Sequence, residues 1–108
     1  MAHYLLEVAY TPEAWAAQIK SPQNRVEIVG KVLARLGGRF EQTYFAFGDY
    51  DIIAFMELPD NVSAAAFSLA VHAGGAVSAC RTTPLMTVEE GIAAIRKAGD
   101  LGYQPPSA

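Results

Sequence analysis

The chain has 108 residues, a formal net charge of −3 and an isoelectric point near 5.2. A chain of this length fits one domain with one hydrophobic core. Its eight Lys and Arg residues are scattered, so we expect no nucleic-acid partner, since phosphate binding needs a basic face. No apolar run is long enough for a bilayer and no signal peptide is evident, which predicts no membrane partner and a cytoplasmic location.

The N-terminal part predicts a strand followed by a helical region. Residues 3–10 are rich in β-formers and end at Thr11 and Pro12, which suit the N-cap and first position of a helix. Ser21 and Pro22 repeat that signal, so the helical region is expected to be two pieces or one kinked piece. The second piece carries one apolar stripe, which contains Val26, Val29, Leu33 and Leu36.

The middle of the chain predicts a hairpin. Gly37 and Gly38 end the helical region, and residues 39–47 and 50–58 read as strands joined by a Gly48-Asp49 turn. Asp60 is expected to cap a helix over residues 61–73. The expected buried side of that helix contains Val62, Ala66, Leu69, Ala70 and Ala73.

The C-terminal part predicts a strand, a helix and a tail. Residues 76–83 read as a fourth strand limited by Pro84. Thr87 and Glu90 form a capping box for a helix that runs to about Ala98, with Val88, Ile92 and Ile95 on one side. Residues 99–108 are expected to be a tail that is mobile or docks on a neighbour through Leu101 and Tyr103.

The order β-α-β-β-α-β-α predicts an α+β, ferredoxin-like fold with an antiparallel sheet, formed by residues 3–98 as a single domain. The right-handed crossover rule places both crossover helices on one face of the sheet. Residues 50–58 are apolar on both faces, and 52% of the chain is hydrophobic with a mean hydropathy of +0.18. We therefore expect the uncovered sheet face to pack against a second copy, in a homodimer or a higher homo-oligomer.

Several short motifs, in this order and spacing, resemble the GYD-domain family over about residues 3–98. They are Tyr10-Thr11, Leu36-Gly37-Gly38, Gly48-Asp49-Tyr50-Asp51, Glu57-Leu58-Pro59-Asp60 and Gly75. The chain departs from the family pattern at Ala14-Trp15, Arg81 and Pro84.

The resemblance implies a small bacterial or archaeal protein of the dimeric α/β-barrel type. That superfamily includes cofactor-free monooxygenases, haem-dependent enzymes, stress-responsive dimers and small-molecule sensors, so the fold does not assign a function. By this analogy alone, His3 or His72 is a candidate haem ligand.

Five residues are candidates for a ligand-binding site. Tyr50 and Asp51 start the third strand, where they orient a ligand or simply form a turn. Glu57 is a carboxylate in an apolar strand, with Arg81 as its candidate partner across a dimer. His3 lies on the first strand and could reach the cavity.

The histidines and the cysteine do not form a recognisable metal-binding or nucleophile motif. His3, His72 and Cys80 show no metal-ligand spacing, so no metal and no cofactor are expected. Cys80 cannot form an internal disulfide, which fits a reducing compartment, and reads as an inert thiol. No catalytic residue can be named from the sequence.

The sequence leaves three functions open. The first is an oligomeric module that binds a small hydrophobic molecule between helices and sheet. The second is a cofactor-free oxygenase- or isomerase-like enzyme on an aromatic or polyketide-like substrate, which requires at least two of the five candidates to converge on one cavity. The third is a structural oligomer with no ligand.

Overall fold

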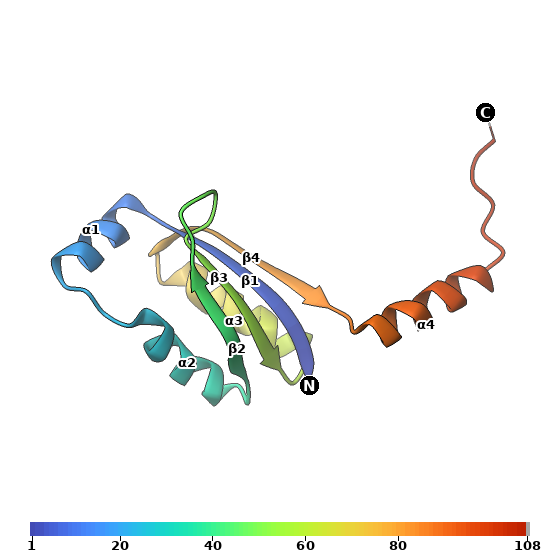
Figure 1. Cartoon of the computed structure of the whole chain (residues 1–108), viewed down its shortest axis with the longest axis horizontal. Coiled ribbons are helices and arrows are strands. Elements are labelled where there is room, and N and C mark those ends of the chain that lie inside the picture. The colour runs from blue at the N-terminus through green and yellow to red at the C-terminus, as the bar shows by residue number, and fades with distance from the viewer. Residues whose placement is uncertain (108) are drawn as a thin grey trace.

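The computed structural model describes residues 1–107, and their secondary structure follows the predicted order (Figure 1). The elements are β1 (Ala2–Tyr10), α1 (Pro12–Lys20), α2 (Arg25–Arg35), β2 (Arg39–Phe45), β3 (Ile52–Leu58), α3 (Asn61–Ala73), β4 (Val77–Leu85) and α4 (Val88–Gly99). Residue 108, the last of the expected tail, lies outside the described residues. No helix within residues 1–107 has the length and apolar character needed to cross a membrane.

The four strands form one antiparallel sheet in the order β2-β3-β1-β4. Helices α2 and α3 both contribute to a pocket over the sheet face that carries Leu6, Val8 and Ile52, so they cover the same face. The predicted ferredoxin-like α+β fold is therefore confirmed. The opposite face has no covering layer among the described residues, and we call it the open face.

The core lies between the sheet and helices α2 and α3. Strand β3 alternates as expected, because Ile52, Ala54, Met56 and Leu58 are buried while Ile53 and Phe55 face the open side. Tyr4, Leu6 and Val8 of β1 point to the same core face. Leu33 of α2 and Phe67 of α3 close the core from the helix layer.

The junction from α2 to β2 is tightly packed. Gly37 has a φ of 80°, and the Gly38 N–H donates to the Leu33 carbonyl at 2.9 Å, which ends the helix as a glycine C-cap does. A Cβ on Gly38 would lie 2.4 Å from the Glu57 carbonyl oxygen and 2.5 Å from Leu58 Cδ2. Gly38 therefore allows α2 to sit directly against the end of β3.

The hairpin between β2 and β3 is longer than the predicted two-residue turn. Both strands are shorter than expected, and residues 46–51 form a loop. A hydrogen bond joins the two ends of this loop, because the Ala46 N–H donates to the Asp51 carbonyl at 2.8 Å. No residue of this loop has a positive φ, which two-residue hairpin turns require. The Asp51 N–H donates to the Val8 carbonyl at 2.8 Å, so hydrogen bonds hold this residue both to β1 and to Ala46.

Two further predicted boundaries were wrong. Helix α2 starts after Asn24, whose side chain accepts a hydrogen bond from the Glu27 N–H at 3.1 Å, and not at Ser21 and Pro22. Strand β4 continues past Pro84 to Leu85. A proline is tolerated there because β4 is an edge strand, so one side of its backbone needs no partner.

Helix α3 begins after Asp60 as predicted, but its predicted buried side was wrong. Its buried residues are Ala64 and Phe67, whereas Val62 and Leu69 are 79% and 70% exposed. The helix carries apolar residues all around, so spacing alone did not distinguish its faces. The bulk of Phe67 determines the orientation, because this ring fills the core under the helix.

Helix α4 projects away from the sheet, and the chain beyond it continues outward (Figure 1). The predicted capping box is present, with the Glu90 N–H donating to Thr87 Oγ1 and the Thr87 N–H donating to Glu90 Oε1. This projection gives a radius of gyration of 17.5 Å, whereas a compact chain of this length has about 13 Å. The apolar stripe of α4, formed by Val88, Ile92 and Ile95, is exposed.

Substituting Gly38→Ala tests the packing at the end of α2. We expect a loss of about 1–3 kcal/mol in the free energy of unfolding, because the new methyl overlaps backbone that cannot easily move. Urea unfolding measures this loss. Gly48→Ala is the matched control, since a Cβ there meets nothing within 4 Å. Equal stability of the two variants would contradict this account.

Candidate functional site

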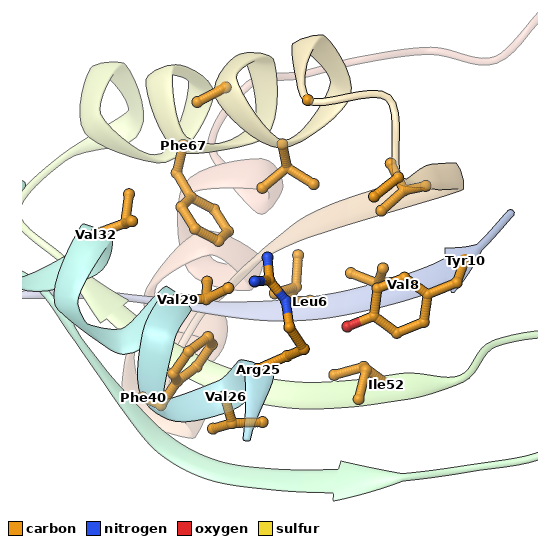
Figure 2. A pocket seen from close by; sticks show the side chains of 15 residues that line it. Leu6, Val8, Tyr10, Arg25, Val26, Val29, Val32, Phe40, Ile52 and Phe67 are labelled. Carbon is orange, nitrogen blue, oxygen red and sulfur yellow. The ribbon is translucent and has the colours of Figure 1, made fainter. Parts of the chain in front are cut away.

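An apolar pocket of about 270 Å³ lies between α2, α3 and the covered face of the sheet (Figure 2). Its floor is formed by Leu6 and Val8 of β1 and Ile52 of β3, and Phe67 of α3 closes one side. Its remaining lining is also mostly aliphatic or aromatic. It consists of Tyr10, Arg25, Val26, Val29, Val32, Phe40, Ala70, Val71, Gly74, Ala76 and Val77.

Only two lining side chains carry polar groups, Arg25 and Tyr10. Figure 2 shows the Arg25 guanidinium and the Tyr10 hydroxyl directed toward the middle of the pocket. Within the described residues, no carboxylate lies within ion-pair distance of Arg25, which is half-buried. Burial raises the pKa of the Tyr10 hydroxyl, and the Arg25 charge opposes that shift. The pocket therefore combines an apolar body with one cation and one neutral hydroxyl.

Asp51 fixes the position of Tyr10. Its Oδ2 accepts hydrogen bonds from the Tyr10 N–H at 2.8 Å and from Trp15 Nε1 at 3.2 Å. The Trp15 ring meets the Tyr10 ring edge to face, with 5.3 Å between centroids. Asp51 thus connects the β2–β3 loop, the end of β1 and helix α1 behind the pocket. It does not itself line the pocket.

The predicted candidates do not gather around this pocket. None of His3, Tyr50, Asp51, Glu57 and Arg81 is among its lining residues. Tyr50 lies half-buried in the loop before β3. Arg81 is exposed on β4, where it pairs in register with Glu7 of β1 and not with Glu57. Cys80 faces α3, and burial raises the pKa of its thiol.

His3 and Glu57 are brought together, on the open face. They are paired in the β1–β3 register, with His3 Nδ1 3.8 Å from Glu57 Oε1. Two residues of β2 join them, because His3 Nδ1 lies 2.8 Å from Glu41 Oε1 and Arg39 Nε donates to Glu57 Oε2 at 2.9 Å. Within the chain the partner of Glu57 is therefore Arg39, and the pairing with Arg81 across a dimer stays a prediction.

Sequence reasoning missed Arg25, Arg39 and Glu41. Arg25 was one of eight scattered cations, and only the packing of α2 over the sheet places it at the pocket. Arg39 could have been found from the hairpin, because it lies opposite Glu57 in the β2–β3 register. Glu41 lies at an irregularity between Phe40 and Gln42, which strand alternation does not predict.

The chain matches the GYD domain family over residues 4–95. This match covers most of the chain, and it agrees with the motif order in the sequence and with the ferredoxin-like sheet. The chain therefore belongs to the GYD domain family. No curated protein matches it.

Substituting Asp51→Ala tests the contacts behind the pocket. Removing the acceptor of two hydrogen bonds should lower the free energy of unfolding by about 1–3 kcal/mol and shift the fluorescence of the only tryptophan. Urea unfolding followed by tryptophan emission measures both effects. Asp49→Ala, at an exposed loop position, should change stability by less than about 0.5 kcal/mol. An unchanged emission spectrum in Asp51→Ala would contradict the Trp15 contact.

Proposed function

We propose that this chain is a ligand-binding module that takes a small amphipathic acid into the pocket between α2, α3 and the sheet. The observation that carries the proposal is the Arg25 guanidinium, directed into an otherwise apolar pocket without a carboxylate partner among the described residues. A half-buried cation gains most from an anionic partner that hydrogen-bonds to it. The Tyr10 hydroxyl is a second donor for the same anionic group.

The pocket limits the size and shape of the ligand. A dry cavity of about 150 Å³ accepts benzene, so the larger pocket here, about 270 Å³, suits one ring or a short branched chain with an acidic end. The floor of Leu6, Val8 and Ile52 offers no hydrogen bonds, so it favours the apolar part. The acidic group would lie beside Arg25 and Tyr10.

Self-association is the second part of the proposal. The open face carries Tyr44 and Phe55, which are 56% and 39% exposed, beside Leu5 and Ile53. A second copy of the chain would cover this face and meet the exposed stripe of α4, in a homodimer or a higher homo-oligomer. In this arrangement residues 3–98 are one domain, and the tail that follows α4 docks through Leu101 and Tyr103. The lone Cys80 supports a cytoplasmic location.

A matched pair of ligands tests the acid preference. We expect 3-phenylpropionate to bind at least about tenfold more tightly than 3-phenylpropanol, because a hydrogen bond to a charged group contributes about 1.5–3 kcal/mol. Titration calorimetry or ligand-observed NMR measures both affinities. Arg25→Leu should abolish the difference between acid and alcohol, whereas Arg35→Leu, at the exposed end of the same helix, should retain it. Equal binding of acid and alcohol by the unsubstituted protein would refute the proposal.

A charge on the open face tests the dimer. Phe55→Glu should shift the protein toward monomer in sedimentation velocity, because a carboxylate in place of the phenyl ring would be buried between two sheets. Ile19→Glu is the control, since Ile19 is 76% exposed and lies on α1, which is not part of the sheet. A monomeric unsubstituted protein, or no change in Phe55→Glu, would rule out this interface.

A further inference from the structure

Three adjacent strands bring one imidazole and two carboxylates together at one end of the open face. His3 of β1 and Glu57 of β3 are opposite each other in register. Glu41 of β2 joins them at the irregular position where the β2–β3 pairing shifts between Phe40 and Gln42. We call His3, Glu41 and Glu57 the three-ligand cluster.

The spacing of the three-ligand cluster is close to that of a metal site. Two donor atoms that each lie about 2.1 Å from one ion can be at most about 4.2 Å apart. His3 Nδ1 is 2.8 Å from Glu41 Oε1 and 3.8 Å from Glu57 Oε1, and the cluster has one donor atom from each residue within 4.8 Å of the others. A shift of less than about 1 Å in one carboxylate brings all three within range.

Arg39 orients the Glu57 carboxylate toward His3. Its Nε donates to Glu57 Oε2 at 2.9 Å, which leaves Oε1 as the oxygen that faces His3. A group that fixes one carboxylate oxygen in this way orients the other toward a metal. With neutral histidine, the two carboxylates and one guanidinium carry a net charge of −1, so a divalent cation is favoured at this position.

The surroundings leave room for further ligands. The cluster borders an open hollow that is also lined by Arg39, Gln42, Phe55, Leu85, Met86 and Thr87. In a single chain the side chains of His3, Glu41 and Glu57 are 37%, 31% and 16% exposed, so an ion can reach them before a second copy covers the open face. Water or a small anion would complete the coordination from the hollow.

We propose that His3, Glu41 and Glu57 form a binding site for a divalent first-row transition-metal ion, with open coordination positions toward the hollow. An imidazole with two carboxylates suits Zn²⁺, Co²⁺ or Mn²⁺ better than Mg²⁺ or Ca²⁺, which prefer oxygen ligands alone. The site lies on the opposite face of the sheet from the apolar pocket. It therefore does not depend on the proposed binding of an acid.

Metal titration of the full, tag-free chain tests the site. We expect one Zn²⁺ per chain by calorimetry, with the affinity for Zn²⁺ reduced at least about tenfold in His3→Ala and in Glu41→Gln. Substituting a residue that only hydrogen-bonds to a metal ligand already lowers metal affinity about 10–100-fold, so removing a ligand should lower it at least as much. His72→Ala is the matched control, because His72 is the other histidine and lies at the exposed end of α3. Urea unfolding in EDTA checks that each variant folds.

Co²⁺ absorption identifies the ligands independently. Visible absorption bands of bound Co²⁺ without a thiolate-to-metal charge-transfer band would support a site with nitrogen and oxygen ligands. They would exclude Cys80 as a ligand. Zn²⁺ binding that is absent in the unsubstituted protein, or unchanged in both folded cluster variants, would overturn the proposal and leave the cluster as an ion-pair network. Loss of binding in His72→Ala would overturn it in favour of a site on α3.

Discussion

The register of β1 against β3 is the constraint on which both candidate sites depend. Side chains alternate along a strand, so a slip of one residue would exchange the two faces of the sheet. In the observed register, Val8 pairs with Ile52 on the covered face, where both form the pocket floor. The same register pairs His3 with Glu57 on the open face, where the ionic cluster forms. One set of backbone hydrogen bonds therefore positions an apolar and an ionic site.

The two faces differ because the helices cover only one of them. Helices α2 and α3 bury the core face of the sheet and leave a pocket where their side chains do not fill the space between Leu6 and Phe67. The open face receives no layer from the described chain, and α4, which follows the edge strand β4, extends away from the sheet (Figure 1). A single copy thus exposes apolar residues of the sheet, such as Tyr44 and Phe55, beside the ionic cluster, and it also exposes the apolar stripe of α4.

Of the motif residues that identify the family, only Tyr10 lines the pocket. Asp51 and Gly38 have architectural roles, since Asp51 joins β1 to α1 and Gly38 lets α2 meet the end of β3. The other polar group of the pocket belongs to Arg25, which lies outside the motifs. In this chain the motifs thus contribute mainly to the scaffold. Membership of the GYD domain family therefore defines the fold more closely than the function.

The sequence by itself determined the order of elements, the alternation of β3 and the caps at Thr11, Asp60 and Thr87, because these depend on neighbours within a few residues. Only the tertiary structure decided which side of α3 is buried, since that helix is apolar all around and Phe67 had to find space in the core. Tertiary structure also decided both candidate sites. Arg25 lies at the pocket because α2 packs over the sheet. His3, Glu41 and Glu57 lie together because their strands are neighbours in the sheet. These residues are far apart along the chain, so the sequence did not predict that they form sites.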